Sequence, residues 1–158
     1  MRIDSIDANI VQLFSDEPRI GVLEASRRLG LARATVQSRL DKLVAGGAIA
    51  SFAPRLAPAE FGYPVSAYVS VRVEQRAGHT QLGDFLAAIP EVTEVHTVSG
   101  DFDMLCRVVA TSNADLQRVL DRISEHPTPV RTSSSIVLTT HFEQRTLPAF
   151  VAAAERGP

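Results

Sequence analysis

The chain has 158 residues, of which 45% are hydrophobic, and its formal net charge is −2. This length can bury a substantial core in one domain or in two small ones. The near-neutral charge excludes a polycation, so any affinity for nucleic acid must come from a local cluster of basic residues. The single cysteine, Cys106, cannot form an internal disulfide, and no apolar run approaches the roughly 18 residues of a membrane span.

Two short helices are predicted at the N-terminal end. Over residues 6–14 apolar side chains recur with the spacing of one helical face, and Asp4 and Asp7 stand where side-chain oxygens cap the first free N–H groups of a helix. A second helix over residues 22–29 should end at Gly30, because glycine adopts the left-handed conformation that closes a helix. The acidic start is also unlike a signal peptide, so we expect a cytoplasmic protein.

A third helix follows a tight turn and begins at Arg33. Its buried stripe should consist of Val36, Leu40, Leu43 and Val44. The glycine pair at 46–47 stops this helix, and the apolar residues 48–50 predict a short strand. Residues 19–46 are therefore predicted as a helix-turn-helix in which residues 33–42 form the reading helix.

Charge separates this N-terminal region from the rest of the chain. Between Arg19 and Lys42 basic residues outnumber acidic ones by six to two, whereas acidic residues predominate beyond Gly62. The N-terminal region is therefore the part of the chain that should bind phosphate.

The outward face of the reading helix is small and polar. Short side chains let the backbone approach base edges, and glutamine can pair with adenine, whereas arginine and lysine hold phosphates without reading sequence. Base contacts are predicted for Ala34, Thr35, Gln37 and Ser38. Phosphate contacts are predicted for Arg27, Arg28, Arg33, Arg39 and Lys42. The alternative is a three-helix bundle whose charges are simply solvated.

Beyond residue 50 the chain changes character. Prolines interrupt residues 51–64, which are predicted as an ordered linker. Strand, helix, strand, strand, helix and strand are then predicted over residues 65–73, 81–89, 92–99, 104–110, 114–124 and 130–139. This βαββαβ order is that of a ferredoxin-like fold. The prediction is an α+β chain with a (winged) helix-turn-helix domain at 1–50, the linker 51–64, a ferredoxin-like domain at 65–142 and a C-terminal tail at 143–158.

Short motifs follow one another along nearly the whole chain: Ile3-Asp4-Ser5-Ile6-Asp7, Arg19-Ile20, Gly30-Leu31, Thr35-Val36, Arg39-Leu40, Leu43, Gly47-Ala48-Ile49, Gly100-Asp101-Phe102-Asp103 and residues 130–138. These motifs, in this order, resemble the leucine-responsive and asparagine-operon regulator family (Lrp/AsnC). The resemblance implies a sequence-specific transcriptional regulator that responds to a small metabolite, with an amino acid as the first candidate. One departure is Ala32, where the family usually has serine, because alanine removes an N-cap acceptor from the reading helix.

A candidate effector site lies in the C-terminal half. Residues 99–103 form a short connection with a glycine and two carboxylates, which composition alone also explains as a polar hairpin turn. The resemblance implies that this turn and hydroxyl groups of the last strand line a pocket for a free amino acid between subunits. The residues that correspond in this sequence are Gly100, Asp101, Asp103, Thr132 and Ser134. A zwitterion needs a carboxylate for its ammonium group and donors for its own carboxylate, and this set has both.

Two other functions remain open at this point. Chains that look like this family include siroheme decarboxylases, in which His96, His126 and Arg107 would surround a tetrapyrrole. A metabolite-sensing adaptor that binds no DNA is the second. The four histidines lack the spacing of a helical metal pair, so we expect no metal and no cofactor beyond the amino acid effector.

Assembly follows from the way in which operators are read. Two reading helices about one DNA turn apart see twice the sequence that one helix sees, so a homodimer is expected. The resemblance further implies rings of dimers, often octamers. The expected partners are double-stranded DNA and a small effector, and no membrane.

Overall fold

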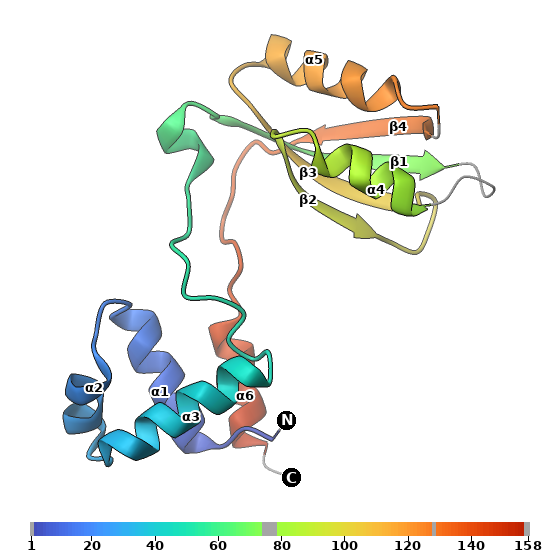
Figure 1. Ribbon diagram of the computed structural model, residues 1–158. Helices are drawn as coiled ribbons and strands as arrows, with labels where there is room; N and C mark the ends of the chain where they lie inside the picture. The colour runs from blue at the N-terminus through green and yellow to red at the C-terminus, as the bar shows by residue number, and fades with distance from the viewer. Residues whose placement is uncertain (1, 74–78, 128, 157–158) are drawn as a thin grey trace. The chain divides into compact units, whose positions relative to one another are not determined.

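The computed structural model describes residues 2–73, 79–127 and 129–156 (Figure 1). The chain forms two compact units, of which one comprises Met1–Pro54 with Phe142–Pro158 and the other comprises Arg55–His141. The first is helical and the second contains a four-stranded antiparallel sheet with helices. The predicted α+β fold class, with a helix-turn-helix followed by a ferredoxin-like domain, is confirmed.

The N-terminal part of the first unit consists of three helices: α1 (Ser5–Asp16), α2 (Val22–Leu29) and α3 (Arg33–Ala45). Their core is built from Ile10, Ala25, Val36 and Leu40. As predicted, Gly30 ends α2 in the left-handed conformation, with φ of +64°. The tight turn that follows directs the chain into α3.

The end of α3 differs from the prediction in two ways. Val44, predicted to be buried, is 46% exposed. The residues predicted as a strand, 48–50, are not one, because the N–H groups of Ala48 and Ile49 both donate to the carbonyl of Leu43, at 2.9 and 3.1 Å. These donors close the C-terminus of α3 instead of pairing with a strand.

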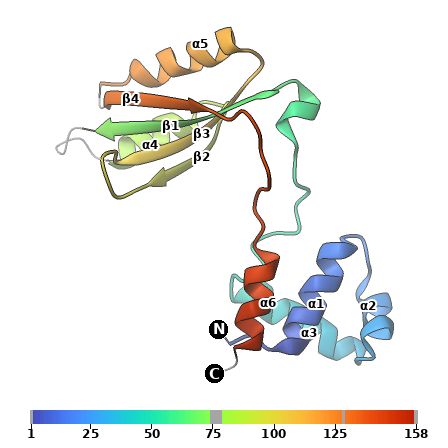
Figure 2. The ribbon, with the colours of Figure 1, turned by 180° about the vertical axis from the view of Figure 1, so that it is seen from behind.

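The C-terminal segment forms a fourth helix of the first unit. Helix α6 (Leu147–Glu155) packs against α1 (Figure 2), and its Ala154 is buried. The sequence predicted this segment as a C-terminal tail at 143–158, with a frayed helix over 150–158, and did not assign it to the first unit. The apolar composition of α6 gives it a face that is buried against α1, which links two segments more than a hundred residues apart.

The second unit follows the predicted βαββαβ order. Its elements are β1 (Val65–Val73), α4 (His79–Ala87), β2 (Val92–Thr97), β3 (Met104–Ala110), α5 (Asn113–Ser124) and β4 (Pro129–Ile136), after a short 3₁₀ helix, η1 (Pro58–Phe61). The sheet order is β2-β3-β1-β4, and every neighbouring pair is antiparallel. Helices α4 and α5 therefore both connect strands of this one sheet, as in the ferredoxin-like fold.

One face of this sheet carries the core. Alternate residues of β1, such as Val69 and Val71, are buried with Leu86 of α4 and Val119 of α5. Cys106 lies in this core, where burial raises the pKa of its thiol to about 11. The thiol therefore stays protonated and unreactive at neutral pH, as a small buried apolar group.

Candidate nucleic-acid interface and effector turn

Helix α3 presents the polar face that its sequence predicts. Val36, Leu40 and Leu43 are buried in the first unit. The predicted contact residues that are exposed are Arg33, Ala34, Gln37, Ser38 and Lys42, and Thr35 is half-buried. The exposed set contains both small side chains and hydrogen-bonding groups, which a helix in the major groove needs.

The start of α3 has no side-chain cap. Its N-cap residue is Ala32, and no side chain accepts a hydrogen bond from the first turn. The predicted loss of the usual capping oxygen is therefore confirmed. The helix depends on packing of its apolar stripe instead, because a missing cap costs about 1 kcal/mol.

Arg39, which was predicted to contact phosphate, is bonded to two carboxylates of the same unit. Its Nη1 donates to Asp4 Oδ2 at 2.6 Å and to Asp7 Oδ1 at 3.0 Å. The Asp7 side chain is 1% exposed and that of Arg39 is 26% exposed. Arg39 therefore joins α3 to the first turn of α1, and it would have to leave two carboxylates to bind a phosphate.

The same two carboxylates cap α1. Asp4 Oδ1 accepts hydrogen bonds from the N–H groups of Ile6 and Asp7, and Asp7 Oδ2 accepts from the Asp4 N–H, which completes the predicted capping box. The hydrogen bond from Arg39, followed by that from the Asp7 backbone, lowers the pKa of Asp4. The sequence predicted both caps but missed their shared cation, because Arg39 lies more than thirty residues away.

The arginines of α2 also have carboxylate partners. Arg28 is hydrogen-bonded to Glu17, which raises the pKa of the guanidinium, and its Nε lies 3.5 Å from Glu24. Arg27 lies 3.5 Å from the same Glu24. Since these side chains are exposed, a phosphate can compete for them, but it must first displace an acid.

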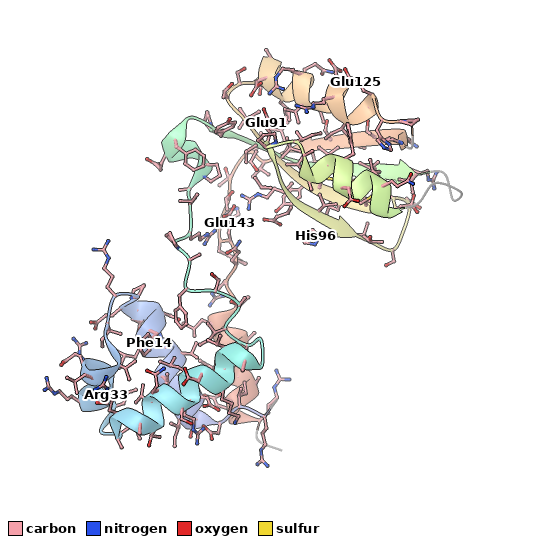
Figure 3. All side chains as sticks on the ribbon, viewed as in Figure 1. Phe14, Arg33, Glu91, His96, Glu125 and Glu143 are labelled. Carbon is pink, nitrogen blue, oxygen red and sulfur yellow. The ribbon has the colours of Figure 1, made fainter. Side chains whose placement is uncertain are left out.

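Arg33 differs from the other predicted phosphate ligands. Figure 3 labels it at the start of α3, and within the described part of the chain it makes no ion pair or hydrogen bond through its side chain. Lys42, by comparison, donates weakly to the Arg2 carbonyl at 3.4 Å. The guanidinium of Arg33 is therefore available to a phosphate without a competing partner.

Asp41 has a partner on the exposed face of α3. Gln37 Nε2 donates to Asp41 Oδ1 at 2.8 Å, one helical turn away. The i, i+4 spacing of an amide and a carboxylate was the signal that could have identified the pair.

The proposed effector turn is fixed to the sheet by one of its two carboxylates. Asp103 Oδ2 accepts a hydrogen bond from the Val73 N–H at 2.9 Å, and the Asp103 N–H donates to the Val71 carbonyl at 3.0 Å. Gly100 has a φ of +126°, a conformation that favours glycine. Asp101 is exposed, so its carboxylate is the one open to a ligand.

The two hydroxyl residues of β4 share a face with the core of the second unit. Thr132 pairs with Val71 and Ser134 pairs with Val69 in the register of β1 and β4. Asp103 and Thr132 therefore lie on opposite sides of β1 at the same level of the sheet, whereas Ser134 lies two residues further along. Thr132 is the hydroxyl nearest in register to the turn.

Only two of the three residues considered for a tetrapyrrole lie together. His96, labelled in Figure 3, and Arg107 both lie near Glu94, at 3.4 and 3.3 Å, on the sheet face opposite the core. The ring of His126 instead packs against Phe85 of α4, with centroids 4.8 Å apart. Among the described residues no group of three or more His, Cys, Asp or Glu side chains could hold a metal ion.

No helix in the described ranges is both long enough and apolar enough to cross a membrane.

Two family models of known proteins match the chain, one in each unit. The model of the AsnC-type helix-turn-helix domain matches residues 3–44, and that of the Lrp/AsnC ligand binding domain matches residues 66–147. The HTH-type transcriptional regulator FL11 of Pyrococcus horikoshii is 33% identical over 147 residues, which cover 92% of this chain and 96% of that protein.

Solved structures show the same architecture. E. coli AsnC superposes with a TM-score of 0.85 at 22% identity, over 94% of this chain and 100% of that one. The feast or famine regulatory protein of M. tuberculosis, in complex with L-methionine, superposes with a TM-score of 0.79 at 28% identity, over 90% of this chain and 96% of that one. The two units therefore occur together in known proteins.

Proposed function

The chain belongs to the Lrp/AsnC family of transcriptional regulators, and from that premise we propose that it reads specific DNA sequences through α3 under the control of an amino acid. It is a regulator and not an enzyme. The observation that carries the proposal is the exposed polar face of α3, on which Gln37 and Ser38 can meet base edges while Arg33 is free to bind phosphate.

The test separates base reading from phosphate binding. Preferred duplexes are first selected from a random pool, and the affinities for selected and random duplexes are then compared. Gln37→Ala is expected to reduce discrimination by about 1–3 kcal/mol, because glutamine reads a base edge. Arg33→Ala is expected to weaken both duplexes alike and to reduce the salt dependence by about one counterion, because a phosphate contact carries no sequence information.

The control is Gln117→Ala, which removes an exposed glutamine from α5 of the other unit and should change neither affinity. Equal effects of the Gln37 and Arg33 variants would contradict the division of roles. If no duplex is retained even at low salt, the DNA-binding proposal fails and a metabolite-sensing adaptor becomes the better hypothesis.

The effector part of the proposal rests on chemistry at the turn between β2 and β3. Asp101 offers an exposed carboxylate for an ammonium group, and Thr132 and Ser134 offer hydroxyl donors for a carboxylate. The M. tuberculosis relative was solved with L-methionine, which makes this amino acid the first to test. The proposal requires no resident cofactor.

We also propose that the regulator is a homodimer that assembles further, with an octamer as the expected size. Among the described residues, four large apolar side chains are more than 60% exposed: Phe52 (64%), Leu56 (70%), Leu138 (93%) and Phe142 (71%). Contacts between copies would remove such side chains from water. Light scattering should give a mass of at least twice the 17.1 kDa of one chain, and a monomer at micromolar concentration would contradict this part.

A further inference from the structure

The hydrogen bond between Gln37 and Asp41 restricts a side chain that is proposed to read DNA. Both residues are exposed on α3, and the Nε2 to Oδ1 distance is 2.8 Å. We propose that Asp41 is a positioning residue that orients the Gln37 amide for adenine. This inference rests on the proposed function, because it assumes that α3 faces base edges.

Elementary hydrogen-bond chemistry fixes which end of the amide faces Asp41. An ionised carboxylate only accepts hydrogen bonds, so the NH₂ group of Gln37 must point toward it, and the reversed amide would set two acceptors against each other. One N–H of Gln37 is used in this bond. The second N–H and the carbonyl Oε1 remain, in a fixed relative orientation.

The remaining donor and acceptor complement adenine. In the major groove adenine presents the N7 acceptor beside the N6 amino donor, whereas guanine presents two acceptors, N7 and O6. The free N–H of an oriented Gln37 can meet N7, and its Oε1 can meet the N6 amino group. Opposite guanine, Oε1 would face O6. A glutamine that is free to turn its amide discriminates less, because it can offer its donor to either acceptor.

The charge of Asp41 has a second consequence. A carboxylate on a DNA-facing surface repels phosphates and so opposes binding to any duplex. Asp41 therefore costs affinity for random DNA while it increases preference for one base. Asp41→Asn removes the charge and keeps one acceptor oxygen, but it adds an NH₂ donor that also satisfies the reversed amide of Gln37.

The second unit provides a matched control. Gln117 and Asp121 of α5 make the same i, i+4 bond at 2.7 Å, also with exposed side chains. Asp121→Ala therefore removes the same local contribution to a helix without altering α3. Exposure at both positions means that neither alanine variant disturbs a core.

The test uses the full-length protein and duplexes that differ at the one position whose base preference Gln37→Ala abolishes. Adenine there is replaced by guanine, and separately by 7-deazaadenine, which lacks the N7 acceptor. The wild-type protein is expected to prefer adenine by about 10-fold over either replacement, as for a bidentate amide contact.

Asp41→Ala should reduce this preference to about 2-fold and raise affinity for random duplexes. Asp41→Asn should raise random affinity as well, and its preference should lie between those of Asp41→Ala and the wild-type protein, because an amide at this position no longer fixes the orientation of Gln37. Asp121→Ala should change neither. Persistence of the full preference in Asp41→Ala would overturn the inference while leaving DNA reading by α3 intact. Absence of duplex binding by the wild-type chain would overturn the proposed function itself.

Discussion

Arg39→Ala should lower the free energy of unfolding of the helical unit by about 3 kcal/mol, because it removes the cation that neutralises a buried carboxylate. The Asp7 side chain is 1% exposed and would be left with only the Asp4 N–H as a partner. The expected loss lies at the low end of the usual range since Arg39 itself is partly exposed. Hydrogen exchange followed by mass spectrometry measures it, because α1 and α3 are reported separately from the sheet.

Arg33→Ala is the matched control for this variant. Arg33 lies on the same helix, is exposed and has no side-chain partner among the described residues, so its loss should change stability by less than about 0.5 kcal/mol. Arg39→Ala should therefore change mainly the stability, and Arg33→Ala should change mainly the affinity for DNA. If α1 and α3 are protected from hydrogen exchange as well in Arg39→Ala as in Arg33→Ala, the structural role of Arg39 is contradicted.

Acid provides an independent readout of the same contact. The hydrogen bond from Arg39 holds the pKa of Asp4 below its ordinary value of 3.8. A carboxyl group with a lowered folded-state pKa stabilises the fold above its ordinary pKa, and this contribution is lost as the pH falls through the lower value. The wild-type helical unit should lose protection below about pH 4, and Arg39→Ala should show a shallower dependence over that range.

The sequence predicted the elements of both units because their patterns are local. The alternation in β1 and the stripe Val36, Leu40 and Leu43 in α3 each specify a buried face from residues close together in the chain. The same helical geometry correctly turned Gln37 and Ser38 outward. Local pattern was therefore sufficient for these elements and for the exposed face of the reading helix.

Contacts between distant segments were not predictable in this way. Arg39 sits at the edge of the outward face, where a helical wheel cannot distinguish a phosphate ligand from a partner of Asp4 and Asp7. Helix α6 has no polar face that would reveal its partner, yet it packs on α1. Ala48 and Ile49 have strand-like composition, but their N–H groups bond to Leu43. In each case a partner outside the local pattern determines the role.

Asp101→Ala should abolish the rise in melting temperature that an amino acid effector gives, without changing the melting temperature of the unliganded protein. Ligand at a hundred times its Kd stabilises the folded state by about 2.7 kcal/mol, which corresponds to roughly 10–20 °C for a domain of this size. The Asp101 carboxylate is exposed, so its loss removes the proposed partner of the ligand ammonium group and little else. A thermal-shift series that begins with L-methionine and continues through the other amino acids measures the effect.

Asp103→Ala distinguishes a ligand contact from support of the turn. Its carboxylate accepts the Val73 N–H, so this variant should lower the unliganded melting temperature as well, by the equivalent of about 1–3 kcal/mol for a hydrogen bond to a charged group. Asp121→Ala, on the exposed face of α5, should preserve both the unliganded value and the shift. A ligand-induced shift that survives in Asp101→Ala would exclude this carboxylate as the ammonium partner, and no shift with any amino acid in the wild-type protein would exclude amino acid control. If Asp101→Ala loses the ligand-induced shift and keeps the unliganded melting temperature, Asp101 binds the ligand. Asp103, by comparison, attaches the turn to β1.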